Sequence, residues 1–212
     1  MKQVQVEVAS DVVCPWCYIG KRRLEAALAA WSEKHPDAAK PAVRWLPFQL
    51  NPDMPAEGMP RADYRKAKFG SLERSKQMDA RVVAEGKGEG IDFSFDRMER
   101  QPNTTQAHRL IALAENQDAV VEALFHAHFE QGRNIGDPKV LAEIAAQCGV
   151  TGWPQEAEKR ASEVSKLEEE VRELGISGVP TFIFERRHGI SGAYPPEQLA
   201  EAMRQAATAT TA

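Results

Sequence analysis

The stretch SDVVCPWCYIGKRRLE, residues 10–25, is the part of this sequence that decides the fold. Before it, the valines of residues 4–8 alternate with polar residues, a pattern that predicts a β-strand. After it, apolar residues recur at helical spacing through residues 20–35, and a proline then ends the predicted helix. Cys14 and Cys17 therefore stand where a strand turns into a helix.

The rest of the chain supplies a second group of strands and a long helical block. The order strand–helix–strand, helical block, helix–strand–strand–helix predicts an α/β sheet domain with a large all-helical insertion. A strand is predicted at 43–52, and its Pro47 indicates a sheet edge or a bulge. The helical block is predicted to hold helices within 62–86, 103–116, 118–132 and 137–149, with an extended piece at 91–96. After it we predict a charged helix at 155–174, a hairpin at 181–192 and a helix at 195–207. The predicted domains are 1–54 with 156–207, the insertion 55–155, and a frayed tail 208–212.

Composition limits the classes of partner. Lys and Arg total 27 and Asp and Glu total 31, so the net charge of −4 gives no field that favours nucleic acid. The basic run at residues 21–23 is small and predicts a solvated helix face. No apolar run is long enough to cross a membrane, and the first ten residues lack the apolar stretch of a signal peptide. We therefore expect a cytoplasmic protein.

The position of the cysteine pair suits redox chemistry. Cys14 and Cys17 lie three residues apart on the first turn of a helix, close enough to form a disulfide. Free N–H groups and the helix dipole favour a thiolate there, and such sites lower a cysteine pKa from about 8.5 to between roughly 3.5 and 7.5. We expect Cys14, at an exposed mouth, to attack, and the more buried Cys17 to resolve the mixed disulfide. Pro15 suits the first turn, and Trp16 is expected to lie exposed beside the sulfur.

Two other readings of the pair are a zinc site and a purely structural disulfide. Zinc needs four ligands, but only Cys148 remains as a third cysteine, and His126 and His128 fall on different sides of a helix. No bound metal is therefore expected. A structural disulfide is disfavoured in a reducing compartment, and three cysteines are too few for a disulfide scaffold. Cys148 follows two alanines in a predicted helix, which favours a buried core cysteine over a third redox partner.

Four segments in order carry a resemblance over essentially the whole chain: SDVVCPWCYIGKRRLE, QPNTTQAHRL, LFHAHFEQGRNIGD and GISGVPTFIF. Together they resemble the DsbA-like oxidoreductases of thioredoxin fold, and within them the FrnE branch. The resemblance implies a thioredoxin-like sheet with Pro180 in cis after Val179, packed against the cysteines. It also implies that the Val179 backbone binds an extended peptide as an added strand. The only redox group it implies is the disulfide itself.

The resemblance extends to glutathione-dependent enzymes, the 2-hydroxychromene-2-carboxylate isomerases and kappa-class glutathione transferases. Those enzymes typically carry serine at the position of Cys14. Asn103, Thr104 and His108 are then either pocket residues or a helix cap with a buried partner, and an N-cap suits Asn103. The dipeptide between the cysteines is Pro-Trp, whereas the periplasmic oxidants of the family carry Pro-His. This difference argues against a strongly oxidising cysteine pair.

Three functions follow from the sequence. The first is thiol–disulfide exchange with protein or peptide partners, with glutathione as a candidate co-substrate. The second is glutathione-dependent isomerisation or transfer, which would need a pocket between insertion and sheet. The third is a redox-sensitive binding module without turnover. Neither nucleic acid nor a membrane is an expected partner of any of them.

Overall fold

A computed structural model describes residues 3–209 of the chain, the side chain of Ala209 excepted. Its sheet strands are β1 (Gln5–Ser10), β2 (Ala42–Pro47), β5 (Thr181–Phe184) and β6 (His188–Ser191), and a short ribbon pairs β3 (Met59–Pro60) with β4 (Arg100–Gln101). The helices are α1 (Pro15–Lys34), α2 (Arg61–Phe69), α3 (Leu72–Gly88), α4 (Thr105–Leu113), α5 (Gln117–Phe125), α6 (Pro138–Gln147), α7 (Gln155–Lys159), α8 (Ala161–Glu173) and α9 (Pro196–Ala209), with a 3₁₀ turn η1 (Phe95–Arg97) and a π-helical turn η2 (His126–Glu130).

The four-stranded sheet has the order β2-β1-β5-β6. β1 pairs with β2 in parallel and with β5 antiparallel, and β5 and β6 form the predicted hairpin. β2 is an edge strand, which confirms the prediction made from Pro47. The Trp45 N–H on this strand donates to Gln117 Oε1, 2.9 Å away, so the start of α5 covers part of the edge.

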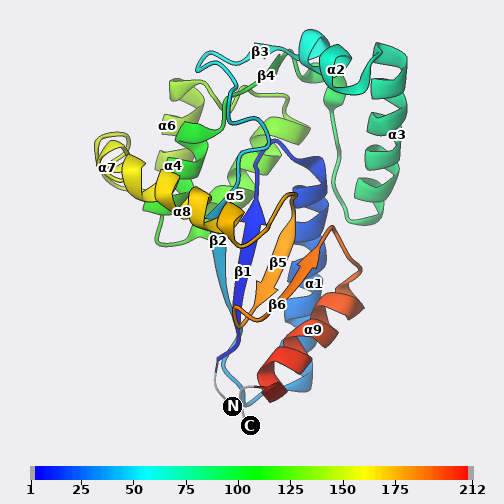
Figure 1. The fold of residues 1–212 in the computed structure, drawn as a ribbon, viewed down its shortest axis with the longest axis vertical. Coiled ribbons are helices and arrows are strands. Elements are labelled where there is room, and N and C mark those ends of the chain that lie inside the picture. Colours follow the sequence, from blue (N-terminus) through cyan, green and yellow to red (C-terminus); the bar gives the residue numbers. More distant parts are fainter. Residues whose placement is uncertain (1–2, 210–212) are drawn as a thin grey trace.

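Helices cover both faces of this sheet (Figure 1). α1 and α9 pack side by side on one face, and α8 crosses the other. The alternating valines of β1 and the phenylalanines of β5 are buried in the core, as their period-two pattern requires. The fold is the predicted α/β arrangement, a thioredoxin-like sheet with a large helical insertion.

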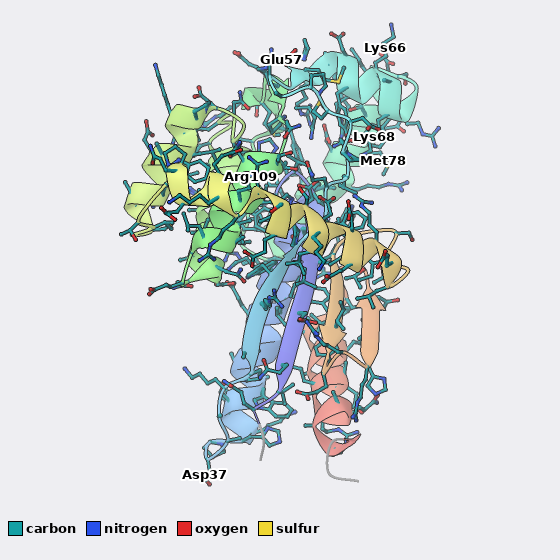
Figure 2. All side chains as sticks on the ribbon, turned by 60° about the vertical axis from the view of Figure 1, so that its left-hand side comes forward. Asp37, Glu57, Lys66, Lys68, Met78 and Arg109 are labelled. Atoms are coloured by element: carbon teal, nitrogen blue, oxygen red, sulfur yellow. The ribbon has the colours of Figure 1, made fainter. Side chains whose placement is uncertain are left out.

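The inserted helices α2 to α6 gather beyond one end of the sheet, where β1 ends and α1 begins (Figure 1). Figure 2 shows Lys66 near the end of this block that is farthest from Asp37, which lies at the opposite end of the molecule. One apolar cluster runs from β1 and β5 into the insertion and includes Phe129. The domain boundaries given by the sequence stay a prediction, since this core is shared between the two parts.

Several predicted helices differ in detail from the observed ones. The segment 62–86 forms two helices, because Gly70 adopts a φ of +83° between α2 and α3. The charged helix at 155–174 is likewise divided, into α7 and α8, and the extended piece at 91–96 leads into the 3₁₀ turn, which begins at Phe95. Helix 118–132 ends in the π-helical turn. α9 continues through residues 208 and 209, which the sequence placed in the tail, and residues 210–212 lie outside the described part.

The prediction of a solvated face at residues 21–23 is wrong. Lys21 is 1% exposed, and carboxylates of Asp118 and Glu122 on α5 lie 3.1 and 3.0 Å from its Nζ. Arg23 bonds Glu89 at the end of α3, with 2.6 Å between Nε and Oε1. Apart from Glu25 on α1 itself, the carboxylate partners of these cations come from the insertion, so the sequence around them gives little sign of their burial.

Candidate active site

The cysteine pair occupies the start of α1, as the sequence predicts. Cys14 is the N-cap residue, with extended backbone angles of φ −96° and ψ 112°, and Pro15 opens the helix. The Cys14 N–H donates to Asp11 O at 2.9 Å, and the Cys17 N–H donates to Cys14 O at 3.0 Å. A tight turn after β1 therefore places one cysteine at the helix mouth and the other one turn inside.

Both sulfurs lie deeper than the sequence suggests. Cys14 is 5% exposed and Cys17 1%, so the expectation that Cys14 sits at an exposed mouth is wrong. Trp16 is half-buried and packs against the apolar core, so it is also less exposed than expected. The cause is the insertion, which closes over the end of the sheet from which α1 starts.

The loop before β5 reaches the same place. The Val179–Pro180 peptide bond is cis, and Val179 O lies 3.7 Å from Cys14 Sγ. Gly20, one turn beyond Cys17, allows the close approach, because a Cβ there would lie 3.0 Å from Pro180 Cγ. The structure thus brings together Cys14, Cys17, Val179 and Pro180, four residues that the sequence placed in one site.

The pKa values of the two thiols move in opposite directions. A hydrogen bond from the Cys17 thiol lowers the pKa of Cys14; burial opposes this effect, and the backbone N–H groups of Cys17 and Trp16 add to it. Burial, together with the negative charge of Cys14, raises the pKa of Cys17 well above its usual value. Because a thiolate is the attacking species, these directions favour Cys14 over Cys17 as the nucleophile.

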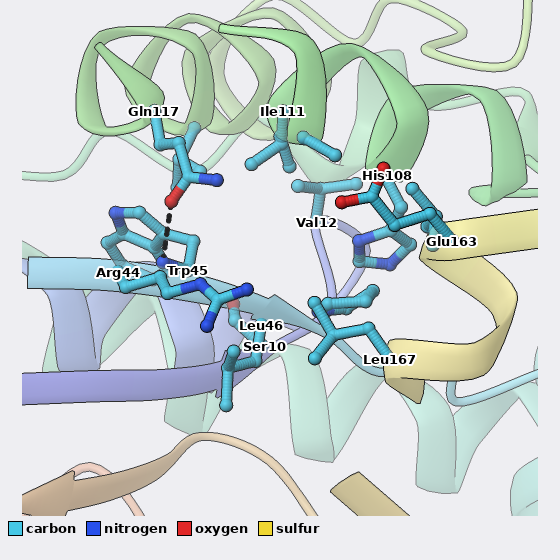
Figure 3. A pocket seen from close by; sticks show the side chains of 14 residues that line it. Ser10, Val12, Arg44, Trp45, Leu46, His108, Ile111, Gln117, Glu163 and Leu167 are labelled. Atoms are coloured by element: carbon cyan, nitrogen blue, oxygen red, sulfur yellow. Dashed lines mark hydrogen bonds between the residues drawn. The ribbon is translucent and has the colours of Figure 1, made fainter. Parts of the chain in front are cut away.

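The residues expected at a pocket divide between two roles. Asn103 Oδ1 accepts from the Thr105 N–H at 2.9 Å and its Nδ2 donates to Met54 O at 2.7 Å, so Asn103 holds the turn that leads into α4. The N-cap residue of α4 is Thr104, so the prediction of Asn103 as the N-cap is wrong. Thr104 is buried at the same helix start, and its carbonyl accepts from the His108 N–H. Of the three, His108 lines the cavity that Figure 3 shows together with Ser10 and Glu163.

Asp11 is a buried acid that the sequence reasoning did not single out. It is fully buried, its Oδ2 accepts from the Leu50 N–H at 2.8 Å, and its Oδ1 lies 3.4 Å from His108 Nε2. The negative charge of Asp11 raises the pKa of Cys14, against the other hydrogen-bonding contributions. Its position three residues before Cys14 could have indicated that Asp11 belongs to the site. Its contact with His108 could not be predicted in this way, because His108 is distant in sequence.

The third cysteine stands apart from this site. Cys148 is partly buried at the end of α6, and its Sγ lies 3.7 Å from Ala119 O. The sequence predicted that Cys148 is buried in the core, and the structure shows it less buried than that. Within residues 3–209, no group of three or more His, Cys, Asp or Glu side chains is arranged to hold a metal ion. A search of the same residues finds no helix long and apolar enough to span a membrane.

The sheet is mixed, a C-x-x-C pair stands at a helix start, and a loop with a cis-proline faces that pair. These three features together define a protein of the thioredoxin-fold oxidoreductase class. Over residues 5–204 the sequence matches the DSBA-like thioredoxin domain family, and the chain belongs to that family. The branch within the family stays a prediction. A probable DsbA oxidoreductase, SCO1869 from Streptomyces coelicolor, is 31% identical, with a TM-score of 0.84 over 97% of this chain and 91% of its own.

Two more distant structures share the fold. The cytosolic disulfide reductase DsbM from Pseudomonas aeruginosa is 20% identical, with a TM-score of 0.65 over 95% of this chain and 97% of its own. A 2-hydroxychromene-2-carboxylate isomerase is 16% identical, with a TM-score of 0.67 over 98% of both chains. The fold alone is therefore common to reductases and isomerases, and the site has to distinguish them.

Proposed function

We propose that this chain catalyses thiol–disulfide exchange, with Cys14 as the attacking and Cys17 as the resolving cysteine. The observation that carries the proposal is the placement of the pair, with Cys14 as the N-cap residue of α1, Cys17 one turn inside and Val179 O 3.7 Å from Cys14 Sγ. The opposite directions of the two pKa changes support it. The Cys14 thiolate attacks a substrate disulfide and forms a mixed disulfide, and Cys17 then attacks Cys14 Sγ and releases the substrate thiol. Run backwards, the same steps transfer a disulfide to the substrate.

The substrate side of the proposal rests on Val179. Its carbonyl lies 3.7 Å from Cys14 Sγ, and its backbone precedes β5, where an extended peptide can add as a strand. The 5% exposure of Cys14 favours such a narrow, extended partner, or a small thiol. Protein or peptide disulfides and glutathione are therefore the proposed partners, and glutathione is also named in a structure of DsbM that covers 95% of this chain.

The cytoplasm is the proposed compartment, and reduction the proposed direction there. DsbM, described as cytosolic and as a disulfide reductase, supports both by its shared fold. Equilibration of the purified protein against glutathione, with each redox state counted by mass, tests the direction. A reduction potential at or below roughly −220 mV is expected for a reductase, and one near roughly −120 mV would identify a disulfide donor instead.

The isomerase alternative has less support. The cavity lined by His108 has a volume of about 70 Å³, while small-molecule sites usually enclose about 300 Å³ or more. The Asn103 amide is occupied by hydrogen bonds to Met54 O and the Thr105 N–H. A cysteine also stands where those enzymes typically carry serine. These observations favour disulfide chemistry over the conversion of a bound small molecule.

Trapping the mixed disulfide tests the function directly. In Cys17→Ser, Cys14 should form a stable adduct with a disulfide-containing peptide or with oxidised glutathione, detected as a mass increase. Cys14→Ser should form no adduct and lose turnover, and Cys148→Ser should keep the activity of the parent protein. Turnover that survives Cys14→Ser would overturn the proposed function.

A further inference from the structure

A groove crosses the face of the sheet that α8 packs on. In Figure 1, α8 crosses only the upper part of β1, β5 and β6, and no helix of the described chain crosses in front of their lower part. The groove between α8 and these strands has a volume of about 510 Å³. Its apolar lining comes from α8, the sheet and the loop before β5, and consists of Leu46, Leu167, Val171, Ile176 and Ile183.

The strand register places one row of residues on the floor of this groove. Glu7 of β1 pairs with Ile183 of β5, and Ile183 pairs with Gly189 of β6. Residues directly opposite each other in a sheet share one face, and all three residues line the groove. A Cβ added at Gly189 would meet nothing within 4 Å. The groove is therefore hollow above β6, where a side chain of another molecule can enter.

Opposite charges border the groove on its two sides. Glu170 and Glu173 line it from α8, whereas Arg186 and Arg187 line it from the turn between β5 and β6. The Glu7 carboxylate on the floor contacts Arg186, with 2.8 Å between Oε1 and Nη2, but the Arg186 side chain stays 72% exposed. The border on α8 is therefore acidic, the border on the hairpin is basic, and both face solvent.

Leu174 stands on the acidic border. It follows the last residue of α8, lines the groove and is 70% exposed, the largest exposed fraction of a large apolar side chain within residues 3–209. Exposed apolar surface with a polar rim is typical of a site that another molecule covers. The covering molecule has to bring an apolar side chain for the groove and two borders of opposite charge.

We propose that this groove is the interface of a homodimer, in which Leu174 of each copy enters the hollow above Gly189 of the other. A two-fold axis through the groove sets the acidic border of one copy against the basic border of its partner, and the same contact occurs twice. The chain itself therefore supplies every feature that the groove requires. The inference goes beyond the proposed function and does not depend on it, since neither Cys14 nor Cys17 lines the groove.

Two other occupants fit the groove less well. A small molecule could fill it, because its volume lies within the usual range of about 300 to 1,000 Å³ for such sites. It would leave the outer side of Leu174 in water, however. A peptide that adds as a strand needs an unpaired strand edge, whereas the floor of this groove is a sheet face, whose strands are paired with one another.

Sedimentation velocity of the full chain over a wide range of protein concentrations tests the proposal. The parent protein should sediment as a dimer that dissociates on dilution. Leu174→Gln should raise the dissociation constant about a hundredfold, roughly tenfold for each of the two buried leucines. Gly189→Leu fills the hollow from within and should also weaken the dimer, while its Cβ meets no neighbour that would hinder folding. Val83→Gln, at an exposed valine of α3, is the matched control.

The charged borders allow a second test with two variants in one solution. Glu173→Arg and Arg187→Glu should each weaken the dimer, because like charges then meet across the two-fold axis. Mixing the two variants should restore it, since each arginine of one copy then faces a glutamate of the other. At about 150 mM salt the Debye length is about 8 Å, so only charges in close contact contribute.

A parent protein that stays monomeric at every concentration would overturn the proposal. A dimer that Leu174→Gln and Gly189→Leu leave as tight as Val83→Gln does would also overturn it, and so would a mixture of the two charge variants that is no more dimeric than either alone. Thiol–disulfide exchange by Leu174→Gln should match that of the parent protein, because the cysteines lie outside the groove. Failure of the dimer therefore leaves the proposed function standing.

Discussion

The two long faces of α1 are held to the molecule by different kinds of contact. The face toward the sheet carries small and apolar residues, and Gly20 leaves no room there for a side chain, because an added Cβ would lie 3.0 Å from Pro180 Cγ and 3.1 Å from Phe182 Cζ. The face toward the insertion carries Tyr18 and Lys21, buried against α5 and η2. Apolar packing thus positions the redox site, while a buried charge network positions the block that closes over it.

In the charge network between α1 and the insertion, the hydroxyl of Tyr18 and the ammonium of Lys21 act as hydrogen-bond donors. Tyr18 OH donates to Glu130 at 2.6 Å, and the Tyr18 ring stacks on Phe125 with 4.9 Å between centroids. Burial opposes the charge on Lys21, but Asp118, Glu25 and Glu122 hold its pKa above the ordinary value. The cost of desolvating this lysine is therefore offset only while its carboxylate partners stay in place.

Removing the charge of Lys21 should strongly destabilise the protein. Loss of one member of a buried ion pair typically costs about 3 to 5 kcal/mol, and the half-exposed partners here reduce the expected loss to about 2 to 3 kcal/mol. Urea unfolding of Lys21→Met measures it, with Lys66→Met on exposed α2 as the control. Equal stability of the two variants would mean that the apolar contacts alone hold the insertion.

A second test on the insertion side uses the pH dependence of stability. Burial lowers the pKa of His128 from 6.5 to about 4, so the unfolded chain binds more protons between these two pH values. Stability must therefore fall as the pH drops from about 6.5 to about 4, by roughly 3 kcal/mol at about 1.4 kcal/mol per pKa unit. His128→Gln should lose this part of the slope in urea titrations at several pH values, and His126→Gln should retain it.

The sheet side of α1 is tested by filling the space at Gly20. A Cβ there would lie 3.0 Å from Pro180 Cγ and 3.1 Å from Phe182 Cζ, so the proline loop must shift. Gly20→Ala should cost about 1 to 3 kcal/mol by overpacking, and should slow the attack of Cys14 on a disulfide peptide. Gly178→Ala, where an added Cβ meets nothing within 4 Å, is the control in the same loop. Equal rates in both variants would show that the loop adapts without affecting the site.

The sequence predicted the sheet side of α1 well because its signals are local. The alternating valines, the turn and the helical spacing after Cys17 are each visible within a few residues, and they place both cysteines at the helix start. The relation to Val179 and Pro180 came from the family resemblance, which supplied the long-range contact. What the sequence did not reveal is the burial of this site, because the helices that cover it are far away along the chain.

On the side of α1 that faces the insertion, burial was even harder to predict from the sequence. Lys21 lies in a basic run that resembles any solvated helix face, and its partner Asp118 is 97 residues away. Asp11 and His108 likewise become neighbours only in the folded chain, where α4 brings His108 Nε2 to 3.4 Å from Asp11 Oδ1. Whether a charged side chain can be buried depends on a partner of opposite charge, and that partner can be distant in sequence. A prediction from the sequence alone therefore places such a side chain at the surface.

The smallest expected effect lies where α1 meets α3. Arg23 of α1 contacts Glu89 just after α3, and an added Cβ at Gly88, the last residue of that helix, meets nothing within 4 Å. Gly88→Ala should therefore stabilise the protein by up to about 0.5 to 1 kcal/mol, since alanine loses less conformational freedom in a helix. Thermal unfolding compares it with Gly86→Ala in the same helix, where a Cβ would lie 2.3 Å from the Phe93 ring and should destabilise. A loss of stability in Gly88→Ala would mean that the end of α3 must bend to keep its contact with Arg23, and that charge constrains the insertion even at its edge.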